Sequence, residues 1–514
     1  MRKFSILWID DEIDQLKAHL IFLESRNYFV KTCVSGKDAL NILMNESFDI
    51  ILLDENMPGL SGLETLTEIS KVYANVPVIM ITRNEEESIM EEAIGSKIAD
   101  YLIKPVNPNQ ILLALKKNLD HNRLITEKTT NTYQQEFREI TLALLEANDA
   151  ESWISIYKRI LYWELQLDAI EDLGLQEILE AQKSEANRGF GKFIECRYPD
   201  WINGLDSPVL SHTVFKSLII PRIQQKKTLL LVIDNLRFDQ WLTLEEYIAP
   251  YYRKTFESAY FSILPTATQY ARNAIFSGLT PLQMQREYPE YWRNDHELEG
   301  KNQFESEFLE NQLKRLGVSI SSEYHKILNA KQGKQLIHKL KAGVTPDLLT
   351  VVYNFVDMLS HAKTDMDVIK ELVSSDKAYR SLTKSWFQNS PLLELIQESK
   401  NQGFQLILTT DHGTINVTHP TKVIGDRETS SNLRYKTGKS LKYEKKDAIT
   451  CSKPSHWQLP GTYMSSTFIF ARNNDFFAYP NNFNHFANFY RNTYQHGGIS
   501  LEEMILPFIV LDPK

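Results

Sequence analysis

Short apolar runs separated by amphipathic stretches dominate the first 120 residues of this 514-residue chain. The runs lie at residues 4–9, 31–34, 49–53, 77–82 and 101–103. Runs of this length are typical of strands in a parallel sheet, because parallel strands need a helical crossover between them. We therefore predict a (βα)5 domain over residues 1–122.

The pattern then changes twice along the chain. Residues 126–196 form long segments rich in Leu and Glu without strand-like runs, which predicts a helical bundle that we assign to 123–205. Beyond residue 210, strand-like runs return at longer intervals and predict a second, larger α/β domain over 206–514. The predicted fold class is α/β, with three domains.

The composition argues against several classes of protein. A net charge of −9 opposes attraction to a nucleic-acid backbone or an anionic membrane, so no direct DNA binding is expected. No segment has the character of a signal peptide or a membrane-spanning helix, so we expect no membrane insertion. The three cysteines, Cys33, Cys196 and Cys451, form no CxxC pair and fit a reducing cytoplasm.

Three carboxylates stand where predicted strands of the first domain end. Asp10 and Asp11 follow the first run, and Asp54 ends the third. Because the carboxyl ends of parallel strands meet at one edge of a sheet, we expect these groups to converge. Mg²⁺ is a cation that prefers clustered carboxylates, and it would orient a phosphoryl group toward Asp54.

Two further residues complete this arrangement. Thr82 ends the fourth run and can donate a hydrogen bond to a phosphoryl oxygen, while Lys104 follows the fifth and can neutralise another. Taken singly, each residue has an ordinary explanation, since an acid after a strand often caps a helix and Lys-Pro often forms a turn. Their shared position at strand ends favours a joint role.

Together these residues resemble the receiver domain of response regulators, including the loop Met57-Pro58-Gly59 after Asp54. The resemblance covers roughly residues 1–120 and implies that a partner histidine kinase phosphorylates Asp54. It also implies the roles of the other residues: Asp10, Asp11 and Asp54 as magnesium ligands, Thr82 and Tyr101 as the switch pair, and Lys104 as the contact to the phosphoryl group.

In the larger α/β domain, acids again follow apolar strands. Asp234 ends one strand, and Asp411 and His412 follow another. Mixed carboxylate and imidazole ligands suit zinc. Thr268 lies between an apolar run and a helix-like stretch, where a cation could convert its hydroxyl into an alkoxide able to attack phosphorus.

A second set of ligands is present. Asp357 and His361 are four residues apart, which places them on one helix face, and His496 lies near the end of the chain. Two ions about 4 Å apart could hold the attacking and leaving oxygens of an in-line displacement. A buried histidine is more often a hydrogen-bonded structural residue than a ligand, so each motif alone is weak.

The order of these residues resembles the alkaline phosphatase superfamily, including the nucleotide pyrophosphatase/phosphodiesterases, whose PTxT signature is matched by residues 265–268. The segments LPTATQYARNAIFSGLTP and VIDNLRFDQW resemble the PglZ-type domain. A receiver, a helical bundle and a PglZ domain in one chain resemble the PorX-type response regulators.

This resemblance implies a zinc phosphodiesterase acting on nucleotides or oligonucleotides, with Thr268 as nucleophile and two Zn²⁺ ions per chain. One ion would be bound by Asp234, Thr268, Asp411 and His412, and the other by Asp357, His361 and His496. Arg272 and Asn273 would contact phosphate oxygens. The resemblance also implies a cytoplasmic protein that controls type IX secretion. Its implied partners are a histidine kinase, an extracytoplasmic-function sigma factor and secretion components.

Two alternatives remain open. In the first, phosphorylation changes how receivers pair in a homodimer and thereby controls the enzyme. In the second, the chain is a phosphorylation-gated adaptor in which zinc is structural. The lysine-dense segment 434–446 could guide an anionic substrate, although such charge runs are more often solvated loops.

Overall fold

The computed structural model describes the chain from residue 4 to residue 514 with short gaps at 74–75, 84–97, 169, 171–172, 296, 298–299, 344, 374, 426–428 and 462–465. Some side chains within helices, including that of His361, also lie outside the described residues. The chain forms two compact units, residues 1–136 and 137–514. Each is described by itself below.

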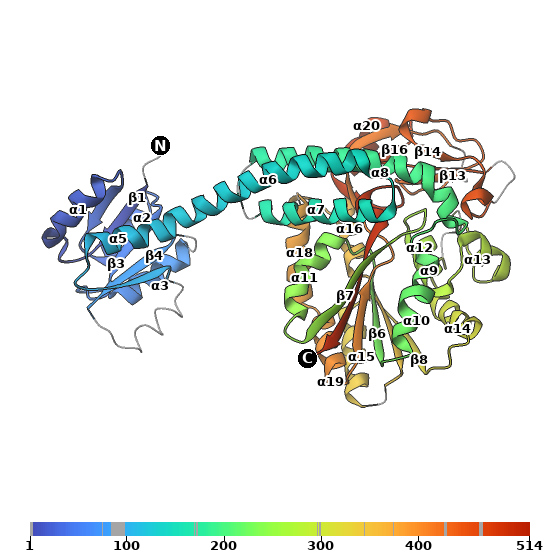
Figure 1. The fold of residues 1–514 in the computed structure, drawn as a ribbon, viewed down its shortest axis with the longest axis horizontal. Helices are drawn as coiled ribbons and strands as arrows, with labels where there is room; N and C mark the ends of the chain where they lie inside the picture. Colours follow the sequence, from blue (N-terminus) through green and yellow to red (C-terminus); the bar gives the residue numbers. More distant parts are fainter. Residues whose placement is uncertain are drawn as a thin grey trace. The chain divides into compact units, whose positions relative to one another are not determined.

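The first unit contains a five-stranded parallel sheet with the order β2-β1-β3-β4-β5 (Figure 1). Its strands are β1 Ser5–Ile9, β2 Phe29–Cys33, β3 Ile50–Asp54, β4 Val78–Thr82 and β5 Asp100–Ile103. The helices described between and after them are α1 Lys17–Glu24, α2 Gly36–Leu43, α3 Gly62–Val72 and α5 Pro108–Leu115. All five predicted strands are confirmed, and they form the predicted parallel sheet.

Alternation along β1 explains why this sheet is covered on both faces. Ile6 and Trp8 belong to a buried cluster with Ile111 of α5, whereas Leu7 and Ile9 belong to another with residues of α2 and α3. Successive side chains of a strand point to opposite faces, so a strand that is apolar throughout requires a helix layer on each side. Polar side chains of the central strands therefore lie at the ends of the strands.

Three long helices follow the receiver sheet. They are α6 His121–Glu146, α7 Ala150–Asp168 and α8 Leu173–Ile202. The helical linker predicted from the sequence is therefore present, but α7 and α8 belong to the same compact unit as the C-terminal domain. The Phe190 ring of α8 lies 5.5 Å from Trp153 of α7 and 6.3 Å from Phe261 of the C-terminal sheet, measured between ring centroids.

The C-terminal part of the second unit contains a six-stranded mixed sheet with the order β7-β18-β10-β6-β9-β8. Its strands are β6 Thr228–Ile233, β7 Tyr252–Phe261, β8 Ser322–Ile327, β9 Leu348–Tyr353, β10 Gln405–Thr409 and β18 Ile505–Pro513. Strands β10, β6, β9 and β8 run parallel, while β18 pairs antiparallel with both β10 and β7. The carboxyl ends of four neighbouring strands therefore share one edge.

Helices cover both faces of this sheet (Figure 1). The helices of this part of the chain, not all of which lie on the main sheet, are α9 Ser211–Val214, α10 Ile220–Ile223, α11 Phe238–Ile248, α12 Thr268–Ser277, α13 Pro281–Glu287, α14 Glu305–Arg315, α15 Ala330–Lys341, α16 Phe355–Asp365, α17 Asp367–Leu372, α18 Asp376–Asn389, α19 Pro391–Asn401, α20 Phe483–Tyr490 and α21 Leu501–Met504. Helices α11, α18 and α19 lie on the opposite face from α9, α10 and α12.

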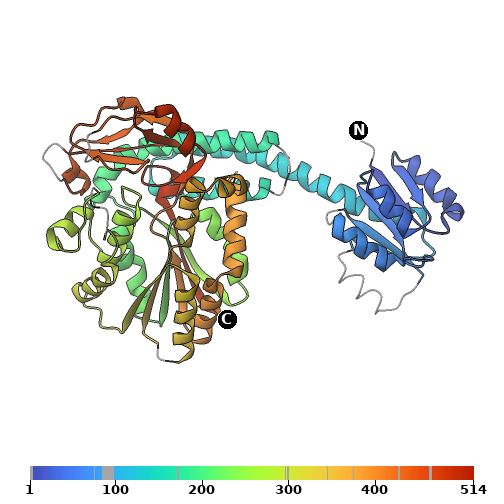
Figure 2. The same cartoon turned by 180° about the vertical axis from the view of Figure 1, so that it is seen from behind.

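Small sheets lie at one end of the main sheet, beside α8 (Figure 2). They pair β11 with β17, β12 with β16, and β13 with β15 and β14. Their bounds are β11 Ile415–Val417, β12 His419–Lys422, β13 Tyr435–Gly438, β14 Ile449–Cys451, β15 Thr467–Phe470, β16 Asp475–Ala478 and β17 Thr493–Gln495. Because β11 begins just after His412, these sheets sit at the carboxyl edge of the main sheet.

Among the described residues, no helix has the combination of length and apolar composition needed to cross a membrane. Cys33, Cys196 and Cys451 are free.

Shortening Phe190 to alanine tests whether the linker helices and the C-terminal domain unfold together. Phe190 is fully buried, and its loss should remove about 3–5 kcal/mol from the free energy of unfolding. In calorimetry of the whole chain we expect one transition, that of residues 137–514, to move to lower temperature. Tyr162→Ala is the control, because Tyr162 on α7 is 54 % exposed. A separate early transition of the helices would contradict a shared unit.

Candidate functional sites

The first candidate site is an acidic cluster at the carboxyl edge of the receiver sheet. Asp10 follows β1 and Asp54 ends β3, and these strands are direct neighbours with Ile9 opposite Leu53. Ligand atoms of Asp10, Asp11 and Asp54 lie within 4.8 Å of one another. Asp10 and Asp54 are buried, whereas Asp11 is exposed, so the cluster faces solvent on one side. This is an acidic pocket typical of a Mg²⁺ site.

Lys104 supplies positive charge to this cluster. Its Nζ lies 3.0 Å from an oxygen of Asp10 and 3.0 Å from an oxygen of Asp54. Burial raises the pKa of Asp54 more than the hydrogen bond from Lys104 lowers it. Burial alone would lower the pKa of Lys104, but its hydrogen bonds to Asp54 and Asp10 raise it. The Oδ1 atom of Asp54 is buried and accepts no hydrogen bond from any described residue, so it fits a further ligand such as a metal ion.

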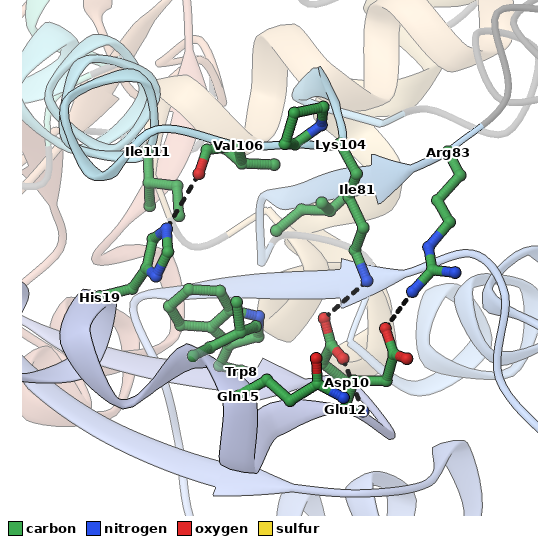
Figure 3. Close-up of a pocket in the computed structure, with 12 residues that line it drawn as sticks. Trp8, Asp10, Glu12, Gln15, His19, Ile81, Arg83, Lys104, Val106 and Ile111 are labelled. Carbon is green, nitrogen blue, oxygen red and sulfur yellow. Dashed lines mark hydrogen bonds and ion pairs between the residues drawn. The ribbon is translucent and has the colours of Figure 1, made fainter.

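The other predicted receiver residues lie at or near the same edge. Thr82 ends β4 fully buried, and its carbonyl accepts the Lys104 N–H at 2.6 Å. Tyr101 lies on β5, half-buried, and packs against the cluster of buried residues beneath α2 and α3. Asp10 and Lys104 also line a cavity of about 460 Å³, into which Trp8 and His19 project (Figure 3). The structure thus brings Lys104 to the acidic cluster and places Thr82 at the end of the strand beside Asp54.

The second candidate site lies at the carboxyl edge of the main sheet. Asp234 follows β6, and Asp411 and His412 follow the neighbouring β10. Ligand atoms of these three residues lie within 4.8 Å of one another, and all three side chains are fully buried or nearly so. The Nε2 atom of His412 lies 3.8 Å from Asp234 and 3.7 Å from Asp411.

The charges of this cluster fit a metal ion. Burial alone would raise the pKa of Asp234, but Arg272 and His412 outweigh it and lower that pKa. Burial and the nearby Asp234 charge raise the pKa of Asp411. The buried Oδ2 of Asp411 accepts no hydrogen bond within the described part of the chain. A buried carboxylate oxygen left in this state fits a cation, and the donor set of two carboxylates and an imidazole suits zinc.

Thr268 lies beside this cluster. Its Oγ1 is 3.0 Å from Nε2 of His412 and 3.5 Å from Oδ1 of Asp234. Thr268 is also the first residue of α12, where backbone N–H groups of the first turn favour an anion. The hydroxyl therefore stands where both a cation and a phosphate could reach it.

Part of the second predicted ligand set lies next to the first. Nε2 of His496 is 3.8 Å from Oδ1 of Asp357, and the His496 ring stacks on His412 with 4.2 Å between ring centroids. The side chain of His361 lies outside the described residues, so its role as a ligand stays a prediction.

The imidazole contacts favour metal binding through Nε2. Nδ1 of His412 lies 3.1 Å from the carbonyl of Gly413, and Nδ1 of His496 lies 3.2 Å from the carbonyl of Thr266. A carbonyl oxygen can only accept a hydrogen bond, so these contacts favour a proton on Nδ1. Nε2 then keeps a free lone pair toward the cluster, which is the arrangement usual for metal-ligating histidines.

Arg272 and Asn273 lie in the interior. Arg272 is buried, with ion pairs of 2.6 Å to Asp234 and 2.6 Å to Glu305. Asn273 is also buried, and its amide donates to the carbonyls of Gln269 and Lys301. These contacts favour supporting roles for both side chains. Their predicted contact with phosphate oxygens stays a prediction.

Sequence reasoning did not single out Asn235, which connects the two ligand sets. Its N–H donates to Asp411 at 3.4 Å, and its side-chain amide donates to Asp357 at 3.4 Å and to Ser360 at 3.1 Å. Asn235 has a φ of 64°, a backbone conformation in which asparagine is enriched. Its position directly after the predicted ligand Asp234 is the sequence feature that could have indicated a role in the site.

The lysine-dense segment 434–446 divides into two parts. Arg434 and Lys436 are buried, with Arg434 paired to Glu503 and Lys436 donating to the carbonyl of Ser430. Lys442, Lys445 and Lys446 are exposed. The first part therefore supports the fold, and only the second part is open to an anionic substrate.

Comparison with known protein families covers most of the chain. Residues 6–116 match the response regulator receiver domain, and residues 123–202 match the PorX response regulator linker domain. Residues 214–511, more than half of the chain, match the BREX system PglZ alkaline phosphatase-like domain.

Individual relatives resemble the receiver part. A transcriptional regulatory protein CpxR homolog of Haemophilus influenzae is 35% identical over 139 residues, which are 27% of this chain and 60% of that protein. The transcriptional regulatory protein ZraR of Klebsiella oxytoca is 33% identical over 132 residues, 26% of this chain and 30% of that protein. The chain therefore spans less than two thirds of the length of these relatives. A solved structure of the Vibrio cholerae chemotaxis protein CheY4 is 28% identical to this chain, with a TM-score of 0.22. The match covers 23% of this chain and all of CheY4.

Replacing Asp54 with asparagine should stabilise the metal-free receiver in a pH-dependent way. A raised folded-state pKa for Asp54 means that wild-type stability falls as pH rises through the range between its unfolded and folded pKa values. Asp54→Asn removes this loss, so its melting temperature should exceed that of wild type at pH 7. The difference should shrink toward zero below about pH 4.

Calorimetry of the receiver transition from pH 3.5 to pH 7.5 provides the test, with the 90 % exposed Asp14 changed to asparagine as control. Adding Mg²⁺ should raise the melting temperature of wild type more than that of Asp54→Asn. A stabilisation that is constant with pH would rule out the titration of Asp54 as its cause.

Proposed function

We propose an enzymatic function for this chain, which belongs to the PorX-type response regulators. It contains a receiver, a PorX linker domain and a PglZ alkaline phosphatase-like output domain. The output domain hydrolyses phosphodiesters of the nucleotide or oligonucleotide class, with Thr268 as nucleophile. The observation that carries this proposal is the hydroxyl of Thr268, 3.0 Å from His412 and 3.5 Å from Asp234 in a cluster suited to zinc.

Two zinc ions are the metals that this donor set fits best. Asp234, Thr268, Asp411 and His412 would hold one, and Asp357, His361 and His496 the other. When bound, zinc would lower the pKa of the threonine hydroxyl and neutralise the negative charge of the phosphate.

The residues of the chain then have distinct tasks. Thr268 Oγ1 attacks phosphorus and forms a phosphothreonyl bond while the ester oxygen leaves as an alcohol. Water subsequently cleaves the phosphothreonyl bond and restores the hydroxyl. Arg272 holds Asp234 in place through its buried ion pair, and the first turn of α12 directs backbone N–H groups toward the phosphate. Asn235 fixes the separation of the two ligand sets.

The receiver supplies the control of this activity. A receiver domain implies a cognate histidine kinase, and we assign Asp54 as the phosphorylated residue, with Mg²⁺ held by Asp10, Asp11 and Asp54. Thr82 and Tyr101 form the switch, and Lys104 contacts the phosphoryl group. Membership of the PorX-type regulators supports a cytoplasmic role in type IX secretion, with an extracytoplasmic-function sigma factor and secretion components as partners and without direct DNA binding.

Thr268→Val tests the enzymatic part, because valine keeps the shape of threonine and removes its hydroxyl. With zinc-loaded full-length protein and a bis-aryl phosphodiester, we expect kcat to fall by at least about a thousandfold while two zinc ions remain bound. Thr255→Val is the matched control, since Thr255 is exposed on β7 and its Oγ1 contacts only the Val510 carbonyl among the described residues, at 3.3 Å.

The outcomes separate the two functions. Full activity in Thr268→Val would refute its role as nucleophile. If wild type and variant are both inert with two zinc ions bound, the output domain is a metal-stabilised, phosphorylation-gated adaptor.

Beryllofluoride with Mg²⁺, which mimics a phosphoryl group on aspartate, tests the control by the receiver. We expect it to increase the dimer fraction of the full-length chain in sedimentation velocity, because the charge on Asp54 alters the switch residues. Asp54→Asn should not respond. An unchanged dimer fraction in wild type would contradict phosphorylation-dependent pairing.

A further inference from the structure

We infer that three side chains of linker helix α8, Lys183, Asn187 and Tyr198, are positioning residues for the zinc site of the output domain. Each contacts a segment that leads to a residue of that site or packs against one. All three lie within the PorX linker match at 123–202 and outside the PglZ match at 214–511, so part of the support of the site comes from the linker.

Tyr198 holds the segment that leads to the nucleophile. Its hydroxyl accepts the N–H of Leu264 at 2.8 Å, and both residues are fully buried. Leu264 begins the turn Leu-Pro-Thr-Ala that ends at Thr268, the first residue of α12. This hydrogen bond therefore holds the middle of the connection between β7 and the nucleophile, whereas Ser262 and Ile263 at its start bond to Met504 and Ser211.

Asn187 holds the segment beside His412. Its Oδ1 accepts the Leu501 N–H at 2.8 Å, and its amide donates to Glu502 at 3.1 Å. The backbone there is packed tightly against the Asp-His-Gly loop: a Cβ on Gly413 would lie 1.9 Å from the carbonyl oxygen of Glu502. A shift of Glu502 would therefore displace the residue that follows His412.

Glu503 extends this contact to the loop of His496. Its carbonyl accepts the Gly413 N–H at 3.2 Å, and its carboxylate accepts the Gly498 N–H at 2.9 Å. The loop of His496 is in turn joined to the nucleophile turn, because the Thr266 hydroxyl donates to the Gly498 carbonyl at 2.8 Å. The segments held by Asn187 and Tyr198 are thus connected to each other.

Lys183 holds a third segment through buried charges. Its Nζ lies 3.1 Å from Asp376, 3.2 Å from Glu164 of α7 and 3.3 Å from Glu502. Asp376 also accepts hydrogen bonds from Arg237 at 2.9 Å and from the Tyr494 hydroxyl at 2.6 Å. Arg237 follows Asp234 closely in sequence, and Tyr494 precedes His496 closely.

The buried location gives these contacts their importance. Lys183, Asn187 and Tyr198 are 6 %, 3 % and 0 % exposed, so the loss of one of these side chains would leave a buried polar partner without its hydrogen bond. A displacement of about 1 Å at a catalytic group can lower a rate by as much as a hundredfold. Helix α8 also contacts α6, because the Gln182 amide of α8 donates to the Phe137 carbonyl of α6 at 2.9 Å. Helix α8 is therefore a structural element through which a change in α6 would reach the site.

Tyr198→Phe is the sharpest test, since it removes one hydroxyl and leaves the ring. For full-length zinc-loaded protein, we expect kcat to fall about tenfold with KM and zinc content unchanged. Hydrogen exchange followed by mass spectrometry should show the Leu264 amide exchanging about tenfold faster, independently of any activity. Asn187→Leu should accelerate exchange in residues 497–503 instead.

Two exposed residues serve as controls: Tyr162→Phe on α7 and Lys192→Leu on α8. The inference rests on the proposed function only for the change in kcat. If wild type is inert but exchange rises locally in Tyr198→Phe, the positioning role stands and the enzymatic proposal fails. Unchanged exchange at Leu264 would overturn the inference. A uniform rise in exchange across residues 137–514 would also overturn it, because it would mark a purely structural contact.

Discussion

A buried carboxylate charge is costly unless a positive charge lies beside it, and this constraint organises both units of the molecule. In the receiver, Asp10 and Asp54 share Lys104 at 3.0 Å each. In the output domain, Asp234 is paired with Arg272 at 2.6 Å, while a neighbouring oxygen of Asp411 has no hydrogen-bond donor among the described residues. Each site thus combines a fixed protein cation with oxygen atoms that remain available to a metal ion.

The same sheet geometry produces two sites with different chemistry. Parallel strands bring their carboxyl ends to one edge of the sheet. Acids that directly follow neighbouring strands therefore lie close together, whatever the sequence of the connecting loops. In the receiver only carboxylates meet, a donor set that magnesium prefers. In the output domain His412 and His496 join the carboxylates with their rings stacked at 4.2 Å, and imidazole makes the site suited to zinc.

The linker helices are part of the output domain in a physical sense. Arg380 of α18 pairs with Glu164 and Asp168 of α7, and Lys183 of α8 pairs with Asp376 of α18. Such buried charges are costly to separate, because each would be left without its partner. The helices therefore belong to one packed unit with the sheet, although the linker and the PglZ domain match separate families.

The sequence by itself determined which residues end the apolar strands, because strand periodicity and the residue that stops it are local properties. It therefore predicted the five receiver strands and the positions of Asp54, Asp234, Asp411 and Thr268. It did not predict β7 and β8, whose polar residues, such as the exposed Lys254 and the half-buried Glu323, hide the strand pattern; their strand conformation depends on neighbouring strands. Only the tertiary structure decided that Arg272 pairs with Asp234 and that α8 supports the site. Those contacts join residues far apart in the chain, and no local pattern encodes which buried charge meets which partner.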